Sequence, residues 1–444
     1  MRQSNDGMLG AMPVPRLVVT MSLPIMLSML ISAVYNLVDS VYVAQYSDEA
    51  FLALSYAYPI QMLLVAFCSG IGVGFSAIFS RRLGEGDQEQ AASAVCHGFF
   101  LYGLCWLLFL LFALTGASPF LRLSTEDPSV ARQGAQYLLI CCGLSIGTCM
   151  QFLTERILQA MGRPAGFMIV QGSGAILNLI LDPIFIFVLD LGVAGAAAAT
   201  VIGQISGALI GFWLVYRLRR QLPIRLRGFR PRGEMLAEMG RVAAPAVVMQ
   251  SLSSFMSLGL NQLLTRWSES AVFVLGAYFK LQTFIFMPIF GISSGLIPIL
   301  SYNYGSGALR RVSASVRFGQ QFTAVLSLSG ALLLSLLASP LLRSAFRASP
   351  EALAMGAPAL RIIALSFFFA GTSIIFCSAF QSLGRSRWSL LVALLRQILL
   401  LLPAAALLLA LKPALVWAAF PLSELISCFA AALLYRRTIQ KQLL

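Results

Sequence analysis

Residues 165–189 read AGFMIVQGSGAILNLILDPIFIFVL, and Asp182 is the only charged residue among them. A helix of about 20 apolar residues crosses a bilayer core, so this stretch is long enough to span a membrane. Similar stretches fill the 444-residue chain, which is 59% hydrophobic and only 11% charged. Ordinary globular domains carry about 25% charged residues. The composition therefore excludes a soluble protein and leaves no room for a separate catalytic domain.

Charged or Gly/Pro-rich breaks divide the chain into twelve predicted spans. No small-residue cleavage site follows a short apolar core, so we expect the first helix to be retained. The predicted fold class is all-α integral membrane, with twelve transmembrane helices in two six-helix lobes. The predicted spans are approximately 15–46, 50–80, 93–116, 133–161, 165–189, 192–216, 241–266, 271–303, 314–339, 354–383, 388–411 and 413–435.

Basic residues are distributed unequally on the two sides of these spans. Of the 31 Lys and Arg residues, 22 flank one side, seven flank the other, and Lys280 and Arg396 fall inside spans. Because cytoplasmic loops carry the excess of Lys and Arg, we expect a multi-pass protein of the inner (cytoplasmic) membrane with both termini in the cytoplasm. The Arg-rich linker at 217–240 suits lipid headgroups. We therefore expect membrane lipids, and no nucleic acid, as binding partners. We also expect a monomer.

An offset of about 221 residues superposes the second half of the chain on the first. Six spans per half is an even number, so the copies share one orientation and are related by a pseudo-two-fold axis along the membrane normal. The predicted domains are an N-terminal lobe (1–216), the linker (217–240) and a C-terminal lobe (241–444). Parallel repeats place a substrate path between the halves, and a duplicated scaffold without transport is the alternative. The collinear matches include Pro24 on Pro245, Gln61 on Gln282, Gly70 on Gly291 and Gly74 on Gly295.

Two acids lie inside predicted spans, where an ionised side chain costs at least about 2.5–3.5 kcal/mol. Asp39 and Asp182 both lie about 10–12 Å below the outer surface, judged from a helical rise of about 1.5 Å per residue. Tyr35 precedes Asp39 by four residues and Asn178 precedes Asp182 by four, and such pairs share a helix face. Thr200, in the next span, reaches the same depth. These five side chains are predicted to converge in one polar pocket.

Pro183 follows Asp182 and cannot donate a hydrogen bond to the carbonyl of Leu179. That carbonyl then stays available as an acceptor, and the helix bends. The alternative is that the acids only join helices by hydrogen bonds. Equal depth on three helices favours ion coupling, because buried acids in transporters usually relay ions. No cofactor is expected besides the coupling ion. That ion is H⁺ or Na⁺, and the Na⁺ ligands would be Asp39, Asn178, Asp182 and Thr200.

At these residues the sequence resembles the multidrug and toxic compound extrusion (MATE) family, within the wider group that includes lipid-linked oligosaccharide flippases. The resemblance rests on the twelve spans, the two lobes, the central linker and the LNLILDP signature at 177–183. One branch of the family holds its cation in the amino-terminal lobe. Its ligands match Asp39, Tyr35, Asn178, Asp182 and Thr200. The resemblance implies a secondary active antiporter, not an enzyme, that exports hydrophobic cationic drugs by alternating access.

Other branches of the family carry essential acids in helices seven, eight or ten. Here the repeat places Leu260 opposite Asp39 and Ala404 opposite Asp182, so we expect no cation site in the second lobe. Lys280 could act as a gate, contact substrate or form half of an ion pair. Lys280 or Arg396 could instead neutralise Glu424. The residues expected along a substrate path or gate are Lys280, Gln61, Gln282, Asn261 and Gln250.

Two further function classes are the alternatives to a drug antiporter. A flippase for a lipid-linked saccharide, or an exporter of an anionic metabolite, should carry more basic residues in its central cavity than Lys280 and Arg396. A multi-span enzyme would need clustered histidines, paired acids or a nucleophile, and the chain has one His. That residue, His97, is assigned no special role. Glu155 and Arg156 are expected to pair locally or to snorkel to the interface.

The eight cysteines lie within or at the edge of apolar stretches, without C-x-x-C spacing. Such cysteines behave as small apolar side chains. We therefore expect free buried thiols, with neither disulfides nor a zinc site.

Overall fold

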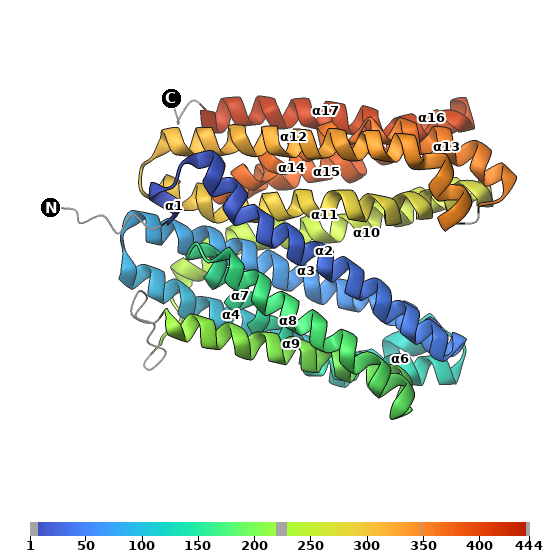
Figure 1. Ribbon diagram of the computed structural model, residues 1–444, viewed down its shortest axis with the longest axis horizontal. Helices are drawn as coiled ribbons and strands as arrows, with labels where there is room; N and C mark the ends of the chain where they lie inside the picture. Colours follow the sequence, from blue (N-terminus) through green and yellow to red (C-terminus); the bar gives the residue numbers. More distant parts are fainter. Residues whose placement is uncertain (1–7, 219–228, 347, 441–444) are drawn as a thin grey trace. The chain divides into compact units, whose positions relative to one another are not determined.

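The computed structural model describes residues 8–218, 229–346 and 348–440, and every regular element in these ranges is a helix (Figure 1). Part of the predicted linker, residues 219–228, lies outside the described part of the chain. The elements of the first half are α1 (Met8–Ala11), α2 (Val14–Tyr46), α3 (Asp48–Glu85), α4 (Gln88–Thr115), α5 (Ala117–Ser124), α6 (Pro128–Gly143), α7 (Ile146–Ala160), α8 (Pro164–Pro183), η1 (Ile184–Val188) and α9 (Gly192–Arg217). Those of the second half are α10 (Gly233–Thr265), α11 (Glu269–Gly305), α12 (Leu309–Pro340), η2 (Leu341–Ala345), α13 (Pro350–Ala364), α14 (Phe367–Ser382), α15 (Ser386–Leu394), η3 (Leu395–Leu399), α16 (Leu401–Leu411), η4 (Pro413–Ala418), α17 (Ala419–Tyr435) and η5 (Arg436–Gln440).

Twelve candidate spans confirm the predicted fold class. Among the described residues, ten helices are long and apolar enough to cross a membrane, and the pairs α6–α7 and α13–α14 each add one span bent by 43°. The two bends lie at the same place in the repeat. In the first, the Ser145 hydroxyl donates to the carbonyl of Cys142, and in the second Ser366 donates to Ile363, both at 2.7 Å. These matched bonds support the internal repeat.

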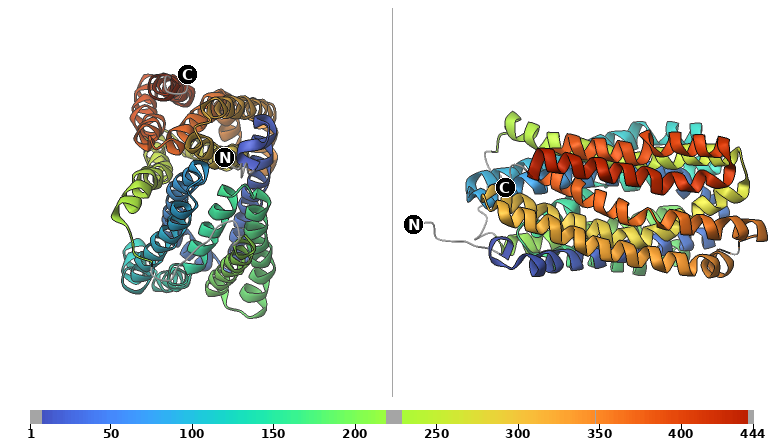
Figure 2. Two further views of the ribbon diagram at one scale, coloured as in Figure 1. Left: turned by 90° about the vertical axis from the view of Figure 1, so that its left-hand side faces the viewer. Right: turned by 90° about the horizontal axis from the view of Figure 1, so that it is seen from above.

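The described chain forms two compact units that do not coincide with its two halves. Unit 1 contains Leu27–Val247, and unit 2 contains Met8–Met26 and Val248–Leu444. The boundaries fall inside α2 and inside α10, and the same offset of 221 relates them. Each repeat therefore gives the first part of its first helix to the other unit. Within unit 2, the orange α14 and the red α17 pack side by side (Figure 2).

Glycines at equivalent positions make this exchange possible. Within unit 1, Gly70 and Gly74 of α3 lie directly against α10, and a Cβ on Gly74 would come within 2.6 Å of the Met239 carbonyl oxygen. Within unit 2, Gly291 of α11 lies against α2, where a Cβ would come within 2.6 Å of Met26 Cγ. Because neighbouring backbones meet at these points, only glycine leaves enough space. The glycines that revealed the repeat thus hold the exchanged segments.

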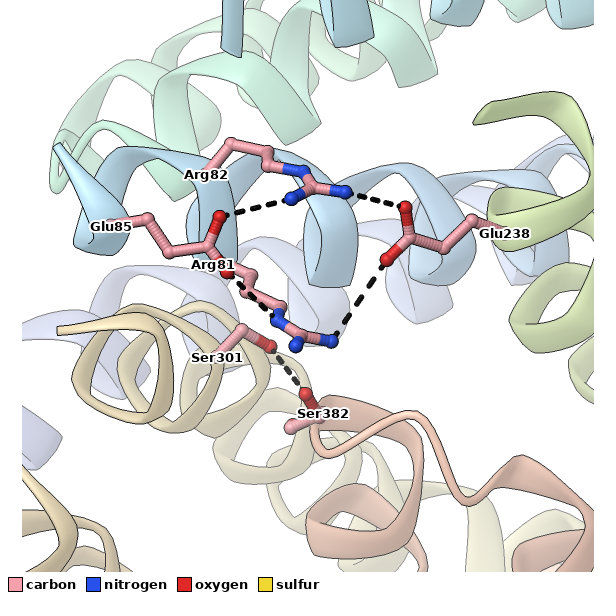
Figure 3. Close-up of polar contacts among 6 residues, drawn as sticks. All are labelled: Arg81, Arg82, Glu85, Glu238, Ser301 and Ser382. Carbon is pink, nitrogen blue, oxygen red and sulfur yellow. Dashed lines mark hydrogen bonds and ion pairs between the residues drawn. The ribbon is translucent and has the colours of Figure 1, made fainter. Parts of the chain in front are cut away.

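The exchanged part of α10 is also joined to α3 by charged groups (Figure 3). Glu238 accepts from Arg82 at 2.8 Å and lies 3.9 Å from Arg81, while Glu85 pairs with the same two arginines at 3.0 and 3.2 Å. Just before α10, the Arg232 amide donates to His97 Nε2 at 2.9 Å. His97 therefore has an anchoring role that the sequence did not predict.

In unit 2 the corresponding end is held by neutral acceptors. Arg311 of α12 donates to the carbonyl of Met12 at 2.8 Å and to that of Leu9 at 3.2 Å. Asn303 of α11 also donates to Leu9, at 3.2 Å, and its Oδ1 accepts from Arg311 Nε at 2.9 Å. Behind this contact, Ser301 donates to the carbonyl of Ser382 at 3.1 Å (Figure 3). Backbone carbonyls in unit 2 thus take the place of the carboxylates in unit 1.

Candidate functional site

Three polar side chains meet inside unit 1 where α8 lies beside α9. Asn178 and Asp182, on α8, are 3% and 0% exposed. The Asn178 amide donates to Asp182 Oδ1 at 3.0 Å and to Thr200 Oγ1, on α9, at 3.3 Å. One amide therefore joins the predicted acid to the predicted hydroxyl across two helices.

Close packing of α8 and α9 brings these groups into range. A Cβ on Gly203 would lie 2.6 Å from the Gly174 carbonyl oxygen and 3.3 Å from Asn178 Cβ. A Cβ on Gly174 would lie 2.8 Å from the Gly203 carbonyl oxygen. Larger residues at either position would separate the helices and withdraw Asn178 from Thr200.

The end of α8 departs from regular α-helical geometry beside Asp182. The helix ends at Pro183 and continues as the π-helical turn η1. This change agrees with the expectation that a proline without an N–H disturbs the hydrogen bonding of Leu179. Single π turns often occur at functional sites. The Asp-Pro sequence therefore sets the helix geometry around the buried acid.

Asp39, on α2, is the second acid of this cluster and is 9% exposed. Its carboxyl group lies near enough to that of Asp182 for their charges to affect each other, and the half-buried Tyr35 lies within electrostatic range of both. Within the described residues, Asp39 Oδ1, Asp182 Oδ2 and Asn178 Oδ1 have no hydrogen-bond partner. The structure thus brings together all five residues predicted for ion coupling. It leaves three buried acceptor oxygens among them without donors.

These unpaired oxygens determine which ligand the cluster suits. A buried acceptor without a donor costs about 1–3 kcal/mol, and more when it is charged. No Lys or Arg of the described residues forms an ion pair with Asp39 or Asp182. A proton shared by the acids would supply the missing donor. Carboxylate and carbonyl oxygens with a hydroxyl also form the hard donor set that a cation such as Na⁺ takes.

The charged residues within the spans of unit 2 are arranged differently. Arg396, on η3, forms two hydrogen bonds of 2.8 Å to the carboxylate of Glu424, on α17. This confirms the alternative that Arg396 neutralises Glu424. Lys280, on α11, is exposed, and among the described residues it has no hydrogen bond or ion pair. It stays a candidate for a gate or a substrate contact.

The other residues predicted along a substrate path fall in different units. Gln61, in unit 1, donates to the Tyr137 hydroxyl at 2.6 Å. Gln282 and Asn261 of unit 2 are half-buried, and Gln250 is exposed. The structure therefore does not bring these four residues together within one unit, and their role stays a prediction.

Sequence reasoning missed a second buried polar group of unit 1. Glu155 and Arg156 are 2% and 5% exposed, so neither snorkels. They also form no direct ion pair: Gln151 donates to Glu155 at 2.9 Å, and Arg156 donates to Gln159 at 2.9 Å. The expectation of local pairing or snorkelling was wrong. The available signal was a glutamine one turn before Glu155 and another one turn after Arg156.

Known proteins resemble the chain over nearly its whole length. A sequence model of the MatE family matches residues 24–184 and 245–407. The multidrug export protein MepA of Staphylococcus aureus (strain MRSA252) is 26% identical over 402 residues, which is 88% of this chain and 86% of that protein. An FAD transporter of Shewanella oneidensis is 26% identical over 418 residues, covering 91% of this chain and 90% of that protein.

Solved structures share the fold. A multidrug resistance MATE family transporter of the MOP superfamily, in its outward-facing conformation, superposes with a TM-score of 0.93 at 22% identity, covering 99% of both chains. A MOP superfamily transporter from Pyrococcus furiosus gives 0.91 at 23% identity, again covering 99% of both chains, and its binding pocket is described as having reverse polarity.

Proposed function

The chain belongs to the MATE family of membrane transporters, and we propose that it is a secondary active antiporter that exports hydrophobic, cationic compounds in exchange for H⁺ or Na⁺. As a transporter it is not an enzyme, and its substrates are small molecules. The observation that carries the proposal is the pair of interacting buried acids, Asp39 and Asp182, without a basic partner in the described chain. An imported cation or proton supplies that missing partner.

The proposed coupling follows from the charge of the cluster. With both acids ionised, repulsion and burial make the pair costly. A proton or Na⁺ entering from outside relieves this cost, with Asn178 and Thr200 holding the polar network around it. Release of the ion inside restores the charged state. Each charge moved inward supplies about 2.3 kcal/mol per 100 mV, which drives export against a gradient.

The proposal is tested by ion flux in liposomes that contain the purified protein. A cationic dye added to the protein should dissipate an imposed H⁺ gradient or Na⁺ gradient, and separate gradients identify the ion. Asp182→Asn keeps the size of the side chain and its hydrogen bonding to Asn178, so it is the matched control. Dye-driven flux that is equal in the two proteins would refute coupling at this cluster.

A second candidate is an exporter of an anionic metabolite or a flippase for a lipid-linked saccharide. The FAD transporter among the relatives favours it, because FAD carries phosphate groups. The exposed Lys280, within α11 of unit 2, is a basic residue that such a substrate can contact. Competition decides between the candidates. FAD should displace the dye only if the protein exports anionic compounds, and Lys280→Gln should then abolish the competition.

The proposed orientation places both termini in the cytoplasm, on the basis of the 22 to seven distribution of basic residues. Cysteines introduced at Ser47 and Ser268 should then react with an impermeant thiol reagent on intact cells. A cysteine at the exposed Ser306 should not react. If only the Ser306→Cys protein were labelled, the orientation would be the opposite of the proposed one.

A further inference from the structure

Three thiols that are far apart in the sequence converge in the interior of unit 1. Cys68 lies on α3, Cys105 on α4 and Cys149 on α7, and their sulfurs all lie within 4.8 Å of one another. The sulfurs of Cys68 and Cys149 are 3.7 Å apart, and the three residues are at most 4% exposed. All eight cysteines are free thiols. Sequence spacing gave no sign of this cluster, because each thiol comes from a different helix.

The size of the sulfur triangle fits a small metal ion. An ion equidistant from three sulfurs that are 3.7 to 4.8 Å apart lies about 2.1–2.8 Å from each, a range that includes the zinc–sulfur distance of about 2.3 Å. Structural zinc takes four ligands, and among the described residues no fourth His, Cys, Asp or Glu joins the group. Soft thiolates select Cu⁺, and three sulfurs in a plane suit that ion.

The surroundings of the cluster favour a soft ion with a net negative charge on its ligands. Apolar side chains, including those of Phe109 and Leu64, belong to the core that contains Cys68 and Cys105. Tyr102 donates to the Cys68 carbonyl at 2.8 Å and so links α4 to α3. A buried cation lies close by. Arg156 Nε has no hydrogen-bond partner in the described residues.

The surroundings of Gly72 show that Arg156 lies close to α3, the helix that carries Cys68. A Cβ on Gly72 would be 2.9 Å from Arg156 Nε and 3.0 Å from the Tyr102 hydroxyl. Gly72 follows Cys68 by four residues, which is about one helical turn or 6 Å. The unpaired guanidinium N–H therefore lies within about two turns of the sulfurs, where it stabilises added negative charge.

We propose that Cys68, Cys105 and Cys149 form a binding site for one Cu⁺ ion. The incoming ion displaces two thiol protons, which pass to solvent, and the third sulfur binds as a neutral thiol. No electron is transferred. The complex then carries one negative charge, which Arg156 balances, and the ion cross-links α3, α4 and α7. The site is separate from the Asp39 and Asp182 cluster, so the proposal does not depend on the transport reaction.

The test is a copper titration of the purified, reduced full-length protein in detergent, with bathocuproine disulfonate as the competing chelator. The same measurement on protein from copper-supplemented cells tests whether copper binds while the protein folds. We expect one tightly held Cu⁺ per chain. X-ray absorption should show three sulfur neighbours at about 2.3 Å. Cys149→Ser should weaken binding by more than about 100-fold, because even partners that merely orient a ligand contribute 10–100-fold.

Matched controls separate the cluster from unspecific thiol binding. Cys142→Ser changes a thiol that is equally buried and lies in the same unit but outside the cluster, so its affinity should equal that of the wild type. Cys105→Ala provides a second variant in case serine prevents folding, and gel filtration checks both. Copper bound equally by the Cys149 and Cys142 variants, or absent from both preparations of the wild type, would overturn the proposal. A Cys68–Cys149 disulfide in place of copper under reducing conditions would overturn it as well.

Discussion

The fifth and sixth spans of the two units meet through opposite chemistry. In unit 1, α8 and α9 approach at Gly174 and Gly203, and Asp182 lies beside them without a basic partner in the described residues. In unit 2, the corresponding helices are joined by Arg396 and Glu424, which neutralise each other. The same helical plan thus supports a fixed, balanced ion pair in one unit and an unbalanced acid pair in the other. In the proposed function, only the unbalanced pair takes up an ion from outside.

The largest effect is expected from breaking the balanced pair. Arg396→Met leaves the partly buried Glu424 without its two hydrogen bonds of 2.8 Å, and removal of one partner of a fully buried pair costs about 3–5 kcal/mol, which is the upper bound here. The double variant Arg396→Met with Glu424→Leu should regain most of that stability. Unfolding of the purified protein in detergent measures both variants. A single variant as stable as the wild type would show that the pair contributes little.

The unbalanced pair should respond in the opposite way. Asp182→Asn and Asp39→Asn remove buried charge, so the proteins should stay folded and lose no stability. Coupled export should nevertheless fall by at least about 100-fold, because the charge that attracts the ion is gone. Thermal unfolding and uphill dye export from the same preparations give both values. Uphill export that persists in both variants would remove the acids from the coupling site.

A smaller effect distinguishes the groups around the acids from the polar residues of unit 2. Asn178→Ala and Thr200→Ala remove a donor and an acceptor of the bonded cluster and should shift the pH profile of exchange, with rates falling about 10-fold for a loss of about 1.4 kcal/mol. Asn261→Ala and Gln282→Ala should leave that profile unchanged and alter which compounds are exported. A changed profile in the second set with a normal one in the first would place the ion site in the other lobe.

The smallest effect should come from the charged anchor of the exchanged segment in unit 1, and the carbonyl anchor of unit 2 is its comparison. Glu238→Gln removes carboxylate contacts that are about 30% exposed, and such pairs are worth about 0.2–1 kcal/mol. Arg311→Gln removes bonds to two carbonyls, each worth about 1.5–3 kcal/mol for a charged donor. Unfolding at low and high salt compares them. As salt rises, the difference in unfolding free energy from the wild type should become smaller only for the Glu238 variant, because salt screens exposed charges.

The sequence predicted the spans and the candidate ion site because both depend on local patterns. Apolar length marks each span, and one-turn spacing places Tyr35 beside Asp39 and Asn178 beside Asp182. Their equal depth in the membrane then predicted that residues on separate helices meet. The Arg396–Glu424 bond could be proposed only as one option, since depth does not reveal which residues of two helix faces meet.

Other features depend on long-range packing that no local pattern encodes. The convergence of Cys68, Cys105 and Cys149 requires the rotation of three helices about their own axes. The sequence predicted that Glu155 pairs with its neighbour Arg156, whereas its actual partner, Gln151, lies one turn away on the same helix. The exchange of segments also escaped prediction, although the glycines that support it were visible as repeat matches.

The exchange has a consequence for the order of synthesis. Unit 1 lacks residues 233–247 until the ribosome has passed the midpoint of the chain, and until then Gly70 and Gly74 of α3 lack the helix that packs against them. The half translated first therefore cannot reach its final packing alone. Its last helical segment arrives with the next repeat, so a gene cut at the linker yields two incomplete products. Duplication of an ancestral six-span unit thus left each copy dependent on the other for its completion.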